Sequence, residues 1–141
     1  MSAPGFLVDT SAFVRFAREQ ELRDVWREQF GAGRIAVCSA TELEIYFVAR
    51  SKMHRDEIET VLHTAYSWVV VPDRVFDRAR SVQDVLVTRG THRSASPVDL
   101  LVAATAEAHG LILLHYDADF LQVAAVTGQP VQWVAEPGSV A

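Results

Sequence analysis

Short apolar runs alternate with helix-patterned segments along almost the whole chain. Runs with the length of buried strands occupy residues 5–9, 34–38, 68–71, 111–114 and 131–134. Apolar residues at helical spacing fill the intervals, at residues 12–17, 21–30, 39–50, 54–66, 74–87, 96–110 and 118–126. Strands that are almost wholly apolar and alternate with helices are typical of an α/β fold. We therefore predict a three-layer α/β/α architecture with a mainly parallel central sheet of four to five strands.

Several of the predicted helices begin with capping signals. Thr10 or Ser11 can cap the helix at 12–17, and Ser39 forms a capping box with Glu42 at the start of the helix at 39–50. The clearest start is Ser96-Pro97-Val98-Asp99, with a capping serine, a proline in the first turn and an acid in the third position. These signals place the helix starts directly after the predicted strands and loops.

The totals are those of one globular domain. The chain has 141 residues, and its hydrophobic fraction of 50% is enough for a sizeable core. We expect residues 1–135 to form the domain and residues 136–141 to form a flexible C-terminal tail.

The single cysteine, Cys38, excludes an internal disulfide framework. The N-terminal residues lack a signal-peptide pattern and no apolar run could span a bilayer, so we expect no membrane contact and a cytoplasmic location.

Carboxylates follow the predicted strands at four separate places. Asp9 ends the first strand, and Glu42 lies one turn into the helix that follows the second strand. Asp99 lies in the first turn of its helix, and Asp117 and Asp119 follow the strand at 111–114. Because ligands bind at the carboxyl ends of parallel strands, we expect these acids to share one edge of the sheet. Such a cluster needs a cation to be stable. Oxygen ligands without a histidine pair or thiol set favour Mg²⁺ or Mn²⁺.

The neighbours of these acids complete the expected site. Thr10 and Ser11 are either helix caps or hydrogen-bond partners of a metal-bound water. Glu44 is expected to point away from Glu42 on the same helix, so it is not included. Taken singly, each acid could be an ordinary capping or turn residue. It is their joint placement that favours a metal site.

Four segments together resemble the PIN domain, and more narrowly the VapC toxins of type II toxin–antitoxin pairs. They are Val8-Asp9-Thr10-Ser11-Ala12, Thr41-Glu42-Leu43-Glu44, Pro97 to Ala104 and His115 to Phe120. The resemblance implies an Mg²⁺- or Mn²⁺-dependent endoribonuclease that cleaves tRNA or rRNA and is inhibited by a VapB-type antitoxin. It also implies a homodimer. It assigns Asp9, Glu42, Asp99 and Asp117 to the family's acidic quartet, with Asp119 as an additional metal ligand.

One position departs from the pattern of that family. Many relatives have Thr or Ser two residues before the fourth acid, where this chain has His115. His115 could contact phosphate, but a structural role at the end of its strand is the interpretation that we favour.

The resemblance directs attention to surfaces for RNA and for the antitoxin. The net charge of −5 argues against broad electrostatic binding of nucleic acid, although bound metal would cancel part of it. Arg89 and Arg93, in the loop before the helix of Asp99, could guide the RNA backbone, the alternative being a solvated surface. Four aromatic residues could contribute to a groove for an antitoxin helix, the alternative being core positions. They are Phe13, Trp26, Tyr46 and Phe47.

Other functions fit the sequence less well. A phosphotransfer receiver or a haloacid-dehalogenase-type phosphatase needs a lysine near the phosphoryl group, and the only lysine, Lys52, lies far from any strand end. A non-catalytic PIN-like adaptor for RNA or protein, and an RNA-processing nuclease without an antitoxin, both stay open as alternatives. Loss of a carboxylate would favour the adaptor, yet every expected acid is present.

Overall fold

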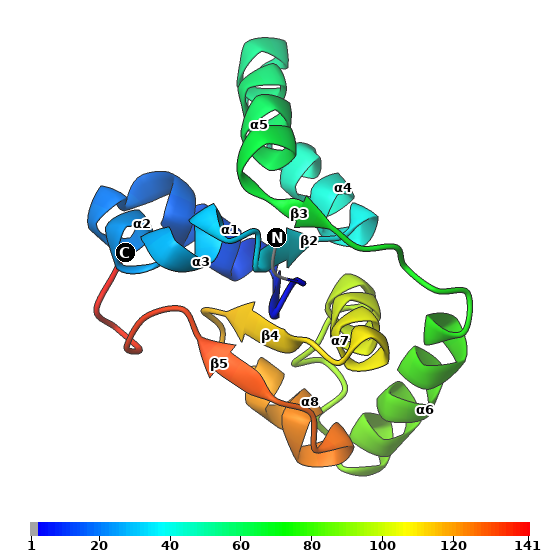
Figure 1. Cartoon of the computed structure of the whole chain (residues 1–141). Coiled ribbons are helices and arrows are strands. Elements are labelled where there is room, and N and C mark those ends of the chain that lie inside the picture. The colour runs from blue at the N-terminus through cyan, green and yellow to red at the C-terminus, as the bar shows by residue number, and fades with distance from the viewer. Residues whose placement is uncertain (1–2) are drawn as a thin grey trace.

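Five parallel strands form the centre of the protein in a computed structural model that describes residues 3–141 (Figure 1). The strands are β1 (Phe6–Val8), β2 (Ile35–Val37), β3 (Ser67–Trp68), β4 (Ile112–His115) and β5 (Val131–Trp133). Their order is β3-β2-β1-β4-β5, and every neighbouring pair is parallel. The predicted α/β fold is therefore confirmed. The strand order reverses direction between β1 and β4, and this is the place where open parallel sheets bind ligands.

Helices cover both faces of this sheet, because successive strand residues point to opposite sides. Leu7 of β1 and Leu113 of β4 belong to one core cluster, while their neighbours Val8 and Leu114 belong to the other. The first cluster is covered by α6 (Val75–Thr88), α7 (Pro97–His109) and α8 (Phe120–Thr127). The second is covered by α1 (Thr10–Arg18), α2 (Gln20–Val25), α3 (Arg27–Gly31), the inner side of α4 (Ser39–Phe47), and α5 (Lys52–Ala65).

Two predicted elements have different bounds in the structure. The helix predicted at 21–30 is divided into α2 and α3 at Trp26, whose backbone leaves the helical conformation and whose indole Nε1 donates to the carbonyl of Val134 at 3.0 Å. The strand predicted at 68–71 is limited to Ser67–Trp68. Val69 still donates to Val37 O at 3.1 Å, but Val70 is exposed and the sheet pairing ends there.

The helix starts also differ in part from the prediction. The capping box of Ser96 and Asp99 is present as predicted. At α1, however, the cap is Asp9 itself rather than Thr10 or Ser11. At α4 the capping box expected from Ser39 is absent, because the helix begins at Ser39 with Cys38 in the capping position and no side-chain cap.

The C-terminal residues contact the domain through one tyrosine. The hydroxyl of Tyr116 accepts from Gly138 N at 2.7 Å and donates to Val140 O at 3.1 Å. These bonds join residues 138–140 to the residue that follows β4. Within residues 3–141, no helix combines the length and the apolar character that crossing a membrane requires.

Candidate metal centre and active site

The site lies at the carboxyl edge of the sheet, where β1 and β4 are neighbours at the reversal of strand order. Asp9 follows β1 directly and Asp117 follows β4 after one further residue. α4, which follows β2, and the first turn of α7 reach the same edge, because α4 packs against both α7 and α1. Four segments distant in sequence thus deliver acidic side chains to one place.

Asp9 is the most deeply buried of these acids, with 3% of its surface exposed. Its Oδ2 atom accepts hydrogen bonds from Ser11 N at 2.9 Å and from Ser11 Oγ at 2.5 Å. Its Oδ1 atom is buried and has no partner among the described residues. Burial raises the pKa of Asp9 from 3.8 to about 6, against the lowering effect of the bonds from Ser11. One oxygen is therefore fixed by the protein, and the other is left available for a ligand.

Asp99 is oriented by the start of its own helix. Its Oδ2 accepts from Ser96 N at 2.9 Å, while its own N–H donates to Ser96 Oγ at 3.1 Å. Burial raises the pKa of Asp99, and the nearby charges of Glu44 and Asp117 raise it further. The capping box therefore positions a carboxylate that lies among other carboxylates.

The third acid in this cluster is Glu44, which was expected from the sequence to point away from Glu42 and was therefore not among the predicted ligands. Asp9, Glu44 and Asp99 each offer a carboxylate oxygen, and these oxygens all lie within 4.8 Å of one another. Thr10 Oγ1 donates to Glu44 Oε1 at 2.5 Å and so holds it beside Asp9. The structure thus places Glu44, and not Glu42, in the acidic cluster.

Glu42 lies on a different side of α4. Residues two apart on a helix point about 200° apart, so Glu42 and Glu44 cannot both face the same site. Burial and the Glu42 carboxylate together raise the pKa of Tyr46 to about 12, which puts Glu42 beside that residue one turn along. Arg55 of α5 lies 4.3 Å from the centre of the Tyr46 ring. The buried side chains of α4, Thr41 and Ile45, lie between the directions of Glu42 and Glu44. Glu44 is on the side where α4 meets α1 and α7, so no local signal in the sequence distinguishes it from Glu42.

Asp117 and Asp119 form the outer part of the site. Asp119 N donates to Asp117 Oδ1 at 2.9 Å, and Asp117 is close enough to Asp99 to raise its pKa. Burial and the Asp117 charge raise the pKa of Asp119, which is an exposed residue. Asp117 therefore borders the cluster, with Asp119 further out.

His115 is fully buried and does not reach the surface. Its Nδ1 accepts from Asp117 N at 3.2 Å, and its ring packs against Phe120 and Trp133. Burial lowers its pKa, so the neutral ring is favoured. This placement fits a structural role at the end of β4 and excludes direct contact with phosphate.

Thr10 and Ser11 act as bridges between the acids and the framework. Ser11 Oγ donates to Asp9 and accepts from Tyr116 N at 2.8 Å, which ties the start of α1 to the end of β4. Thr10 ties the same turn to α4 through Glu44. Both hydroxyls are thus used within the protein to orient carboxylates.

The donor set fits a divalent cation. Three carboxylates converge, the Oδ1 of Asp9 is a buried acceptor without a donor among residues 3–141, and burial together with neighbouring carboxylates raises the pKa values of Asp9 and Asp99. A cation among these oxygens would remove both the repulsion and the unsatisfied acceptor. Hard oxygen ligands of this kind suit Mg²⁺ or Mn²⁺.

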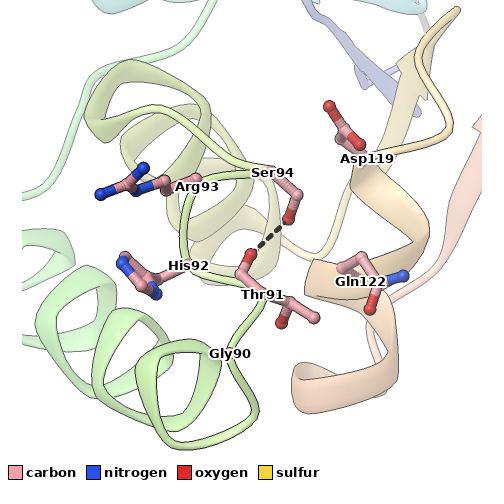
Figure 2. A pocket seen from close by; sticks show the side chains of 7 residues that line it. All are labelled: Gly90, Thr91, His92, Arg93, Ser94, Asp119 and Gln122. Carbon is pink, nitrogen blue, oxygen red and sulfur yellow. Dashed lines mark hydrogen bonds between the residues drawn. The ribbon is translucent and has the colours of Figure 1, made fainter.

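The loop that carries Arg93 borders an open hollow next to this site. Residues 90–94 form one wall, and Asp119 and Gln122 at the start of α8 form the other (Figure 2). The side chains of His92 and Arg93 extend from the opposite side of the loop, away from Asp119 and Gln122. Both Arg89 and Arg93 are exposed, and among residues 3–141 neither forms an ion pair.

The four aromatic residues considered for a partner groove have different environments. Phe13 and Trp26 are buried in the core on the side of α1 and α5, so they contribute no groove. Tyr46 is partly buried against the same core. Phe47 is 88% exposed at the end of α4, and Leu43, one turn earlier, is 69% exposed. Of the four aromatic residues, Phe47 is the one that lies on the surface, where it forms an apolar patch on α4 with Leu43.

Comparisons with known proteins agree with this architecture. The family model of the PIN domain matches residues 6–126. The chain is 40% identical over 134 residues to Ribonuclease VapC21 of Mycobacterium tuberculosis, covering 95% of this chain and 96% of that protein. It is 37% identical over 135 residues to Ribonuclease VapC51 of the same organism, covering 96% of each.

Solved structures with the same fold include two toxin–antitoxin complexes. The DNA-bound VapBC complex of Salmonella typhimurium gives a TM-score of 0.73 at 16% identity, over 94% of this chain and 99% of that chain. VapBC2 of Rickettsia felis, bound to a DNA fragment from its promoter, gives 0.76 at 14% identity, over 94% and 98%. At these identities the similarity establishes the fold.

Proposed function

This chain belongs to the PIN-domain family and, within it, to the VapC ribonucleases, and we propose that it is a toxin whose endoribonuclease activity depends on Mg²⁺ or Mn²⁺. The observation that carries the metal dependence is the cluster of Asp9, Glu44 and Asp99 around the buried, unpartnered Oδ1 of Asp9. The RNA that we propose as substrate is tRNA or rRNA, the class that the family resemblance implies.

Asp9, Glu44 and Asp99 are the residues that we propose to hold the metal, with Asp117 at the open side and Asp119 as an additional ligand. The ion, when bound, supplies the positive charge that activates a water and stabilises the oxygen leaving phosphorus. Glu44 takes the place that was expected for Glu42 from the sequence, because Glu44 is the acid of α4 that lies in the cluster.

The chain's own residues orient this chemistry. Ser11, Thr10 and Ser96 each fix one carboxylate through a hydrogen bond, so the ligands are held in place before the metal binds. The N-terminus of α7, next to Asp99, adds partial positive charge for a substrate phosphate. Asp117, which borders the cluster, is the group that we propose accepts a proton from the attacking water.

The test is cleavage of total cellular RNA by the purified protein, with Mg²⁺, with Mn²⁺ and with EDTA. We expect discrete fragments with either metal and none with EDTA, and mapping their ends identifies the substrate. Undiminished cleavage in EDTA would contradict the metal dependence. No cleavage with any metal would favour the alternative of a non-catalytic adaptor.

We propose that Arg89 and Arg93 bind the RNA backbone. Both are exposed cations without an ion-pair partner in the described chain, and their loop leads directly into the helix of Asp99. Replacing both by alanine should weaken RNA binding roughly tenfold and reduce its dependence on salt, because two phosphate contacts are lost. Filter binding of labelled RNA at several salt concentrations measures this.

The matched control is Arg27→Ala with Arg80→Ala, two exposed arginines paired with Asp24 and Asp77. Equal losses in both double variants would refute the assignment.

We propose that a VapB-type antitoxin covers the exposed surface of Leu43 and Phe47. Phe47 is 88% exposed and lies one turn from the exposed Leu43 on α4. Two apolar side chains at this spacing form a surface against which an amphipathic helix can pack. Phe47→Ser should weaken the complex with the cognate antitoxin about 30-fold or more, as measured by calorimetry. RNA cleavage by the free toxin should stay within about threefold, because the side chain faces solvent.

The control for this surface is Val87→Ser, an exposed apolar position on α6. Unchanged antitoxin affinity in Phe47→Ser would contradict the proposed surface.

The other partner that we propose is a second copy of the chain in a homodimer. Sedimentation equilibrium of the free toxin measures its oligomeric state. A monomer at all concentrations would contradict the homodimer.

A further inference from the structure

An open hollow lies between residues 90–94 and the start of α8, next to the site. It encloses about 430 Å³ and is lined by residues 90–94, Asp119 and Gln122. That volume lies within the range of about 300–1,000 Å³ for small-ligand sites. In Figure 2 the two walls face each other, with Ser94 opposite Asp119 and Thr91 opposite Gln122. The metal chemistry described above uses neither Thr91 nor Gln122.

Both walls of the hollow lead directly to the acidic cluster. Ser94 lies two residues before Ser96, the cap that binds Asp99. Asp119 follows Asp117 by two residues and donates its N–H to Asp117 Oδ1 at 2.9 Å. An RNA chain with one phosphodiester at the cluster therefore has a neighbouring nucleotide within reach of the hollow.

The groups that line the hollow suit a nucleobase better than a phosphate. Gln122 is exposed and offers both a donor and an acceptor to the edge of a base. Thr91 Oγ1 has no hydrogen-bond partner in the described chain, so a rotation of this side chain would present it to a ligand. The cations that a phosphate requires, His92 and Arg93, point away from the hollow.

The loop wall is held in a fixed conformation. Gly90 adopts φ +73°, a left-handed conformation that glycine accepts without strain, and it ends α6. Thr91 N donates to Leu86 O at 2.8 Å, and Ser94 donates to Thr91 O through both its N–H, at 3.1 Å, and its Oγ, at 2.6 Å. A wall fixed in this way loses little conformational entropy when it binds a ligand.

We propose that this hollow binds an unpaired base of the RNA next to the cleaved bond, and that Gln122 reads the edge of that base. The proposal rests on the ribonuclease function proposed above. Sequence-specific proteins recognise RNA chiefly at unstacked bases, which they hydrogen-bond along their edges. The hollow is therefore the part of this site that selects the sequence at which RNA is cut.

The first test is independent of cleavage. GMP, AMP, CMP, UMP and ribose 5-phosphate are titrated separately into the ¹⁵N-labelled full chain and followed by NMR. We expect saturable shifts at the amides of residues 91–94 and at the Gln122 side chain, with affinity at least about threefold higher for one base. Gln122→Ala should weaken that binding roughly 3- to 10-fold, the effect of one hydrogen bond. Gln83→Ala, at an exposed glutamine of α6, should leave it unchanged.

Two outcomes of this titration would overturn the proposal. Ribose 5-phosphate producing the same shifts as the nucleotides would identify a phosphate site. Shifts confined to the acidic cluster, or absent, would show that the hollow binds no base. Thr91→Val is a second variant for this titration. It keeps the side-chain shape and the backbone hydrogen bond from Thr91 N to Leu86 O, so its melting temperature is expected to match that of the wild type.

The second test uses cleavage of a randomised single-stranded RNA pool in Mg²⁺, with the cut ends sequenced. We expect a base preference at one position beside the cut, reduced roughly 3- to 10-fold by Gln122→Ala and retained by Gln83→Ala. Cleavage without preference at the neighbouring positions would overturn the proposal. No cleavage by the wild type would instead contradict the proposed ribonuclease function, and the nucleotide titration would still decide whether the hollow binds a base.

Discussion

Asp9→Asn is expected to reduce RNA cleavage in Mg²⁺ by at least about a hundredfold while making the metal-free protein more stable. The loss of activity follows because the amide removes the charge at the centre of the carboxylate cluster. The gain in stability follows because burial raises the pKa of Asp9 to about 6, so keeping it charged at pH 7.5 costs free energy in the folded state. The unfolded chain has no such cost. We expect the free energy of unfolding in EDTA to rise by about 1–3 kcal/mol.

The measurement is urea denaturation at pH 7.5, with EDTA and with Mg²⁺, beside the cleavage assay. Added Mg²⁺ should stabilise the wild type and leave Asp9→Asn nearly unchanged, because only the folded wild type binds the ion tightly. Asp84→Asn, at an exposed carboxylate of α6, is the control for removing one acid. A variant that is less stable than the wild type in EDTA would show that the Asp9 charge is satisfied within the protein, contrary to our interpretation.

The paired variants Glu44→Gln and Glu42→Gln are expected to differ strongly in activity although they lie two residues apart. Glu44 has an oxygen within 4.8 Å of oxygens of Asp9 and Asp99, so Glu44→Gln should lose cleavage by about a hundredfold and bind Mg²⁺ more weakly. Glu42 lies beside Tyr46 on another side of α4, so Glu42→Gln should keep cleavage within about threefold.

These two variants serve as each other's control, because both exchange a carboxylate for an amide on the same helix. Cleavage rates at saturating Mg²⁺, together with the Mg²⁺ concentration that gives half-maximal activity, separate an effect on chemistry from an effect on metal binding. A large loss in Glu42→Gln with little change in Glu44→Gln would return the role to Glu42. Similar losses in both would mean that α4 as a whole, rather than one acid, supports the site.

Several features of this protein could be read from the order of residues alone. The apolar runs predicted the strands, because a strand buried on both faces needs nearly every side chain to be apolar. The segment Ser96 to Asp99 predicted the start of α7, because capping is a local interaction of adjacent residues. The positions of Asp9 and Asp117 after strands predicted a shared edge, since parallel strands bring their carboxyl ends together.

Other features depend on which side of an element faces its neighbours, and the sequence does not determine that. α4 carries apolar residues around its whole circumference, including Leu43, Ile45 and Phe47, so its pattern did not show that Thr41 and Ile45 face inward. The choice between Glu42 and Glu44 followed from the packing of α4 against α1 and α7, which puts Glu44 beside Asp9 and Asp99. For the same reason Phe13 and Trp26 were candidates for a surface, although tertiary packing places them in the core.

The hollow beside α8 is also a property of the tertiary structure alone. Its walls come from residues 90–94 and from Asp119 and Gln122, which meet only because α6 and α8 pack against each other. The sequence by itself determined the elements, the fold class and the edge at which the acids gather, because these depend on local pattern and on the direction of the strands. The packing of the helices decided which acid of α4 joins the cluster and where a base could bind, because both depend on side chains far apart in the chain.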